Sequence, residues 1–101
     1  MHRPCVRDYY LGYLPALVEV IRAHYKPEDQ FVSSRNVAAY IMDDPVYHQK
    51  FNHLGQVELR KICSYLIRAH LNGSVINASK NRSFLLPHPV SELEASLCAS
   101  A

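Results

Sequence analysis

At 101 residues, with 49% apolar residues, the chain has the size and composition of one globular domain and not of a disordered protein. The formal net charge of +2 is too small to indicate a class of partner by itself. A chain of this length buries only about two-thirds of the surface that it exposes when unfolded, so a partner subunit could add to its stability.

The sequence predicts an intracellular protein with reduced cysteines. No apolar run approaches the roughly 20 residues that cross a bilayer, and the first residues, MHRPCVRDYYLGYL, lack the apolar centre of a signal peptide. Cys5, Cys63 and Cys98 contain no C-x-x-C pair, so neither a disulfide framework nor a zinc site is indicated. We therefore expect a cytoplasmic protein, or a nuclear one in a eukaryote, with no membrane partner.

Charge is distributed unevenly along the chain. Residues 1–55 hold six basic and six acidic side chains, which cancel. Residues 56–82 hold Glu58 alone against five basic side chains, those of Arg60, Lys61, Arg68, Lys80 and Arg82. A positive charge concentrated in one segment is expected where one face of a protein meets an anionic partner.

Apolar periodicity predicts a first helix over residues 14–25, in the segment LPALVEVIRAHY. Pro15 is compatible with its first turn, and Pro27 ends it, because the residue before a proline avoids helical geometry. Residues 1–13 are rich in tyrosine, and Gly12 weakens any continuous helix there. We expect these residues to form an N-terminal arm or a short helix.

The segment FVSSRNVAAYIM predicts a short β-prone pair, FV, followed at once by a second helix over residues 34–42. Ser33 or Ser34 can cap this helix by accepting a hydrogen bond from a free amide of its first turn. Two aspartates before a proline end the helix. We expect residues 43–55 to form an irregular connection that can include one helical turn.

The strongest pattern lies in residues 56–71, where apolar residues recur at helical spacing and predict a long third helix. The helix is expected to close at Asn72-Gly73, a preferred stop. Its stripe, which we expect to face inward, comprises Leu59, Ile62, Cys63, Leu66, Ile67 and His70.

Beyond the third helix, the stretch GSVINASKNRSFLLP holds two short apolar runs that bracket a polar tip, which is typical of a β-hairpin. The domain is then expected to span residues 14–87. Residues 88–101 form a tail that is either flexible or a short docking helix, with Leu93 and Leu97 one helical turn apart.

The order of helix, short strand, helix, longer helix and hairpin resembles the winged helix-turn-helix domain over residues 14–86. The passages that carry this resemblance are FVSSRNVAAYI, which enters the second helix, and LRKICSYLIRAHLNGSVI, which leads from the third helix into the wing. It implies an α+β, mainly helical fold, a three-helix winged helix-turn-helix with a small β-sheet. In that fold the strand before the second helix joins the C-terminal wing hairpin. About a dozen residues separate the second and third helices, where the family usually has a short turn.

The resemblance implies that the third helix is the recognition helix and that the face opposite its apolar stripe reads the DNA. Basic side chains there can pair with phosphates or with guanine edges, and Gln and Ser add hydrogen-bonding capacity. A solvated helix face without a ligand is the structural alternative. The face carries Val57, Lys61, Ser64, Tyr65 and Arg68, with Gln56 and Arg60 toward its edges.

Two further contact regions follow from the same resemblance. The wing tip, Lys80, Asn81 and Arg82, could reach a phosphate backbone or a minor groove, although hairpin loops are also polar through solvation alone. Arg35 could add a phosphate contact at the start of the second helix, where capping alone explains the neighbouring serines.

Neither a metal site nor a catalytic site is indicated. The six histidines do not fall at ligand spacing, and the three glycines sit singly, so no phosphate-binding loop is present. No nucleophile is accompanied by a base and an orienting group, and Cys63 lies on the inward stripe. We expect no enzyme, no cofactor, no metal and no small-molecule substrate.

The N-terminal tyrosines allow two interpretations. Tyr9, Tyr10 and Tyr13 could stack on single-stranded bases, or they could form an interface with a second subunit. The interface is the preferred interpretation, because winged-helix proteins often dimerise through elements outside the three-helix core. We therefore predict a homodimer through these tyrosines, with Leu93 and Leu97 of the tail as further contact residues.

These features predict a small winged-helix transcriptional regulator that binds duplex DNA through the third helix and the wing. A protein-interaction module within a larger assembly is the alternative, because the net charge is small and the connection between the second and third helices is long. An RNA-binding variant ranks third.

Overall fold

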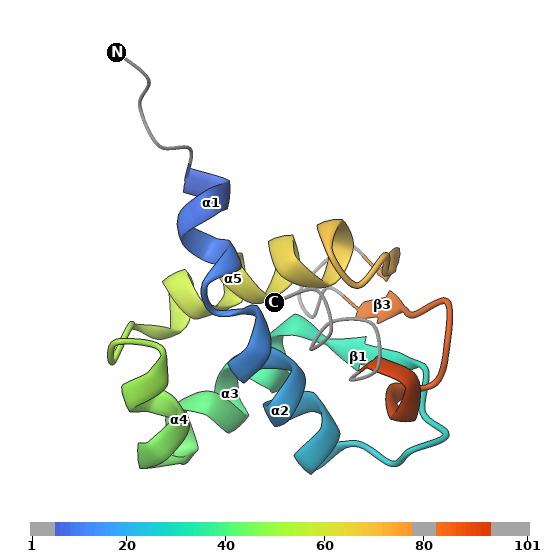
Figure 1. The fold of residues 1–101 in the computed structure, drawn as a ribbon, viewed down its shortest axis with the longest axis horizontal. Coiled ribbons are helices and arrows are strands. Elements are labelled where there is room, and N and C mark those ends of the chain that lie inside the picture. Colours follow the sequence, from blue (N-terminus) through green and yellow to red (C-terminus); the bar gives the residue numbers. More distant parts are fainter. Residues whose placement is uncertain (1–5, 78–82, 94–101) are drawn as a thin grey trace.

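The computed structural model describes residues 6–77 and 83–93 (Figure 1). It is an α+β fold in which helices predominate, as the sequence predicted. In chain order the elements are α1 (Val6–Leu11), α2 (Leu14–His24), β1 (Phe31–Ser33), α3 (Ser34–Asp43), α4 (Pro45–Lys50), α5 (Gln56–Ala69), β2 (Ser74–Asn77), β3 (Ser83–Leu85) and the 3₁₀ helix η1 (Val90–Glu92). Within these described residues, no helix is long and apolar enough to cross a membrane.

The three strands form one antiparallel sheet in the order β1-β3-β2. Val32 of β1 lies opposite Phe84 of β3, and both side chains are almost fully buried. The pairing of β2 with β3 is irregular between Val75 and Asn77. The sheet confirms that the strand before the second predicted helix joins the C-terminal hairpin.

Helices α2 and α3 begin and end close to the predicted residues for the predicted reasons. Pro15 lies in the first turn of α2, and the chain leaves the helix at Tyr25, two residues before Pro27. The amide of Asn36 donates to Ser33 Oγ at 3.3 Å, so Ser33 caps α3. The N-terminal arm contains a short helix, α1, which ends at Leu11 just before Gly12.

The connection between α3 and α5 is more regular than the sequence indicated, because residues 45–50 form the helix α4. Asp44 ends α3 and also caps α4, accepting a hydrogen bond from the amide of Val46 at 2.9 Å. After α4, Asn52 and His53 both have left-handed backbone geometry, with φ of 57° and 54°. These two consecutive left-handed residues turn the chain toward the start of α5.

Helix α5 ends two residues earlier than predicted, at Ala69. Asn72 then adopts a left-handed conformation with φ of 57°, a geometry that Asn tolerates better than most residues. The amide of Gly73 turns back to donate to the Ile67 carbonyl at 2.9 Å. The turn therefore leads directly from α5 into β2.

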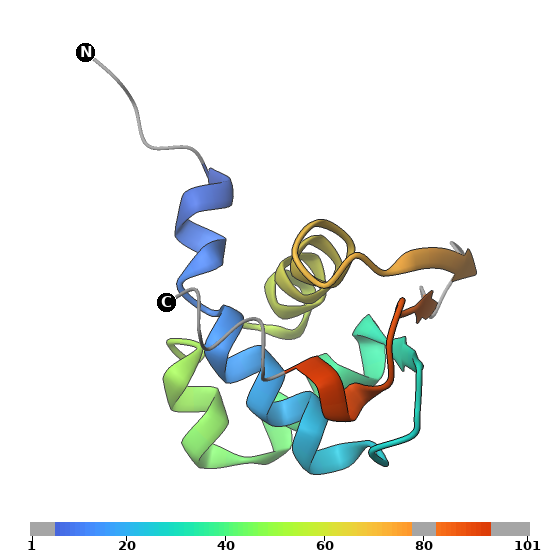
Figure 2. The same cartoon turned by 45° about the vertical axis from the view of Figure 1, so that its right-hand side comes forward.

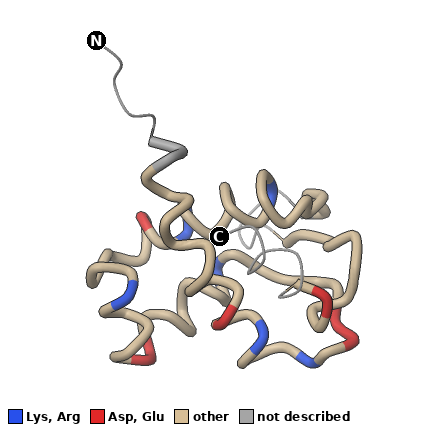
Figure 3. Tube along the Cα trace, viewed as in Figure 1, with Lys and Arg blue, Asp and Glu red and all other residues tan. Residues whose placement is uncertain are grey.

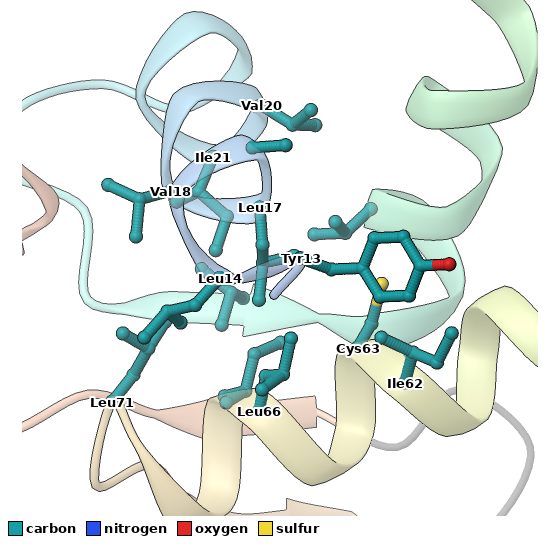
Figure 4. Close-up of a cluster of buried hydrophobic side chains, with 14 of the residues drawn as sticks. Tyr13, Leu14, Leu17, Val18, Val20, Ile21, Ile62, Cys63, Leu66 and Leu71 are labelled. Carbon is teal, nitrogen blue, oxygen red and sulfur yellow. The ribbon is translucent and has the colours of Figure 1, made fainter. Parts of the chain in front are cut away.

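The core lies between α2, α3, α5 and the inner face of the sheet. Figure 4 shows side chains of α2, such as Leu17 and Ile21, gathered above Cys63 and Leu66 of α5. Phe51, which follows α4, is fully buried and stacks on Tyr13 with ring centroids 5.0 Å apart. The inward stripe predicted for the third helix is confirmed, apart from His70, which is only half-buried.

The segment after β3 adds to this core. Val90 and Leu93 are buried, and η1 packs on α2. Two backbone amides of the segment, those of Leu86 and Val90, donate to the carbonyls of Gln30 and Asp29, each at 2.8 Å. Residues 86–93 thus run beside the connection that precedes β1, whereas Leu97 lies outside the described residues.

Replacing Gly73 by alanine is expected to destabilise the fold. A Cβ at this position would lie 2.8 Å from Ile67 Cγ2 and 3.2 Å from Phe84 Cβ, and both neighbours belong to the core. Overpacking of this kind costs about 1–3 kcal/mol, which exceeds the gain of about 0.4–1 kcal/mol from stiffening the unfolded chain. Urea unfolding measures the difference. Gly12→Ala is the matched control, because its Cβ would meet only Tyr9 O, at an ordinary 3.5 Å.

Cys63 is expected to resist thiol reagents in the folded protein. Its side chain is fully buried, and burial raises the pKa of the thiol from the ordinary 9.0 to about 12. In a C5S/C98S variant, a thiol reagent at about pH 8 should modify Cys63 only after denaturant is added.

The same shift has a defined effect on stability. Because the folded pKa lies above the unfolded one, the contribution of Cys63 is complete below pH 9.0 and declines as the pH rises toward about 12. Cys63→Ala should therefore lose less unfolding free energy over this alkaline range than the parent protein. Rapid modification of native Cys63, or an equal alkaline loss in both proteins, would contradict the burial.

Candidate nucleic-acid interface

Helix α5 exposes the side opposite its buried stripe, as predicted. Gln56, Lys61 and Arg68 are exposed, and Val57 is 61% exposed. Ser64 lies on the same side and is half-buried. The structure thus presents the two basic residues Lys61 and Arg68 to solvent on one helix, two turns apart.

Charge is the main property of this surface. Glu58 is the acidic residue of α5, and its carboxylate lies 3.7 Å from Lys61 Nζ with both side chains about half exposed or more. An exposed pair of this kind is worth at most about 1 kcal/mol, so a phosphate can compete for the lysine. Figure 3 shows basic and acidic residues spread over several elements. Helix α5 differs from the other elements in its larger excess of basic over acidic side chains.

Tyr65, which was expected to read DNA, is partly occupied by contacts within the protein. Its ring lies 5.8 Å from that of Tyr10 in α1 and 5.7 Å from that of His70, measured between centroids. Helix α1 lies beside α5, as Figure 2 shows, and contacts it. Tyr65 is half-buried as a result, so its packing role is established by the geometry while its contact role remains a prediction.

Arg60 is also less available to an anionic ligand than its position in the sequence suggested. The residue is half-buried, and its Nε is buried without a hydrogen-bond partner among the described residues. An unsatisfied buried donor is costly to the fold. Only the remainder of the guanidinium group could serve an anionic ligand.

The other predicted contact residues lie on different segments. Arg35 is exposed in the first turn of α3, away from α5 along the chain, and it already takes part in interactions within the protein. Lys80, Asn81 and Arg82 of the wing tip fall outside the described residues. Ser83, where the description resumes, is half-buried in β3.

The residues predicted for a homodimer do not form one exposed surface. Tyr13 is only 6% exposed and Leu93 only 8%, so both belong to the core of the chain itself. Tyr13 also accepts a hydrogen bond from Asn52 Nδ2 at 2.6 Å, and its hydroxyl oxygen lies 2.7 Å from that of Tyr9. Burial raises the pKa of Tyr13 accordingly. Of the three tyrosines, Tyr9 is the one that is mainly exposed.

The sequence did not indicate that the tyrosines would join separate elements. Tyr9, Tyr10 and Tyr13 link α1 to α5 and to the turn after α4 through rings and hydroxyl groups. The crowding of three tyrosines within five residues was the available signal, but it did not reveal their partners. The sequence likewise did not indicate two pairs of contacting rings. The ring centroids of His24 and Tyr40 lie 4.2 Å apart, and those of His48 and His53 lie 5.0 Å apart.

A metal centre is not formed by the part of the chain that the structure describes. There, no group of three or more His, Cys, Asp or Glu side chains is arranged to hold a metal ion. His48 Nε2 lies 2.9 Å from the carbonyl oxygen of Leu54, which gives this histidine a structural partner at the turn after α4.

Comparison with known proteins adds no family assignment: the chain matches no protein-family model, no curated protein and no solved structure. Its function therefore has to be inferred from the geometry of this chain alone.

Replacing Arg60 by methionine is expected to leave stability unchanged or to raise it by about 1 kcal/mol, because the change removes a buried donor without a partner and retains a long apolar stem. Lys61→Met, at an exposed position, should change stability by no more than about 0.5 kcal/mol and serves as the control. Thermal unfolding of both variants gives the comparison. A large loss in Arg60→Met alone would mean that the guanidinium group holds the fold together.

Proposed function

We propose that this chain is a winged-helix DNA-binding protein, a small transcriptional regulator, that contacts duplex DNA through the exposed side of α5. The observation that carries the proposal is the pair of exposed basic residues, Lys61 and Arg68, on a surface helix whose one acidic residue is Glu58. The union of β1 with the β2-β3 hairpin supports the winged-helix assignment, because the resemblance implies that sheet.

The dimensions of α5 suit this role. Lys61 and Arg68 are seven residues apart, or about 10 Å along the helix axis. At this separation the two cations can each contact a different phosphate. The major groove is wide enough to admit an α-helix. Gln56 and Ser64 on the same side supply groups that can hydrogen-bond to base edges.

Helices α1 and α4 would limit how α5 approaches the duplex. Helix α1 covers Tyr65 through Tyr10, and α4 replaces the short turn that usually precedes a recognition helix. The DNA would therefore meet the part of α5 that carries Lys61 and Arg68, with α1 at its border. Arg35 and the wing residues Lys80 and Arg82 are proposed to add phosphate contacts.

Replacing both Lys61 and Arg68 by alanine is expected to weaken binding to duplex DNA and to lower the slope of log affinity against log salt by about two, one for each lost phosphate contact. Fluorescence anisotropy with a mixed-sequence duplex at several salt concentrations measures both effects. Both side chains are exposed, so the fold should be unchanged by circular dichroism.

The matched control is Lys26→Ala/Lys50→Ala, which removes the same charge from exposed positions outside α5. If this control lost as much affinity as the α5 variant, the binding would be a general charge effect. An unchanged affinity in the α5 variant would refute the proposed reading surface. A single-stranded RNA competitor that displaces the duplex would favour the RNA-binding variant.

A protein-interaction module is the second candidate, and one observation favours it. Val57 is 61% exposed in the first turn of α5, next to the proposed reading surface, where an apolar side chain gains nothing from phosphates. If the protein fails to bind duplex DNA even at low salt, this candidate replaces the first. A largely apolar interface would then show little dependence on salt.

A further inference from the structure

The small sheet exposes an apolar surface. Phe31 is 63% exposed, Ile76 52%, Val75 45% and Leu85 38%, and we call these four residues the sheet patch. Phe31 lies directly opposite Leu85 in the register of β1 and β3, so both are on the outer face of the sheet. In the edge strand β2, Val75 lies opposite the buried Phe84 and is therefore on the inner face, and Ile76 lies at the irregularity between Val75 and Asn77. Exposed apolar residues that gather on one small element are more typical of interaction surfaces than residues scattered singly over a protein.

The edge at β2 is open. In the order β1-β3-β2, β2 pairs with β3 on one side, and no backbone hydrogen bond among the described residues reaches its other side. The opposite edge is partly closed, because the amide of Ser33 in β1 donates to the Tyr25 hydroxyl at 3.3 Å. An open edge of this kind is a template for a further strand.

The edge strand β2 is short and irregular, which limits the length that a further strand can pair with, but the described strands lack the charges and prolines that also protect an edge. None of the described residues of β1, β2 and β3 is charged, and none is proline. Lysine, inward-pointing charge and proline are the common means of preventing edge-to-edge pairing. The sheet patch is thus apolar, uncharged and next to an unpaired strand.

We propose that β2 pairs with β2 of a second copy of this chain, antiparallel across a two-fold axis, so that the two sheet patches meet in a continuous sheet. A two-fold interface uses the same surface on both subunits, so it requires a surface compatible with itself. The sheet patch meets that requirement, since two uncharged copies neither repel each other nor bury an unpaired charge. A charged partner would find no complementary group on it.

The size of the patch predicts a weak dimer. The four side chains expose on the order of 300 Å² together, within the range of the largest apolar patch on a typical monomer. Two such patches, with the backbone pairing of β2, fall below the roughly 1,200 Å² of a standard interface. The dimer should therefore form at micromolar or higher concentrations.

The proposal is independent of DNA binding and differs from a dimer through the N-terminal tyrosines. The first experiment is sedimentation of the full chain, without DNA, from about 1 µM to about 1 mM, the range in which interfaces of this size dissociate. The parent protein should shift from monomer to dimer. A monomer throughout overturns the proposal and leaves the edge to a different occupant.

Ile76→Lys tests the position of the interface, because the two-fold axis would place the new charges close together, where like charges are destabilising. It should raise the dissociation constant at least about tenfold. Val46→Lys is the matched control, since Val46 is 60% exposed but lies on α4. A dimer that withstands Ile76→Lys, or that Val46→Lys disrupts equally, contradicts pairing at β2.

A second measurement does not depend on any variant. Hydrogen exchange of the β2 amides that point away from β3 should slow as the protein concentration rises, because pairing encloses the β2 edge. Exchange that is independent of concentration while the protein dimerises would place the interface elsewhere. Tyr9→Ala, which leaves the sheet intact, should not change the dissociation constant. If Tyr9→Ala abolished dimer formation, the tyrosine interface would be favoured instead.

Discussion

The packing of Phe84 against the helical core is the contact on which the arrangement of the sheet and of α5 depends. Phe84 lies opposite Val32 in the sheet, and a slip of β3 by one residue would turn Phe84 from the core to solvent. Its Cβ also approaches the position that a side chain at Gly73 would occupy. The end of α5, the start of β2 and the register of β3 are thereby fixed together. The exposed side of α5 is held in place by this buried contact.

Much of the helical framework could be predicted from local patterns in the sequence. The periodic apolar residues of α2, α3 and α5 identified these helices within one or two residues at either end, because burial of one face repeats with the helical period. The helix α4 was harder to find. Asp44 and Pro45 lie both at the end of α3 and at the start of α4. A stop signal alone gives no information about the structure of the next segment.

The candidate site was predictable only as far as it depends on one helix. The buried stripe of α5 determined the exposed side, and Lys61 and Arg68 are found there. The partial burial of Tyr65 and Arg60 was not foreseeable from the spacing within α5. The burial of Tyr65 arises in part from Tyr10, which is far away in sequence. The core position of Tyr13 likewise depends on a distant residue, Phe51. Contacts of this kind depend on how the helices are arranged, which the spacing of residues within one helix does not specify.

The hydrogen bonds between the segments that flank β1 and β3 have a consequence for the order in which the chain can fold. The side-chain amide of Gln30 donates to the carbonyl of Leu86 across 56 residues of sequence, whereas α3 contacts α4 and α5, the two helices that follow it along the chain. Loop closure costs more conformational entropy as the loop lengthens, and non-local pairing slows folding. Helices α3, α4 and α5 can therefore assemble before the sheet forms. The strand β1, which is only three residues long, then joins the first third of the chain to its last quarter.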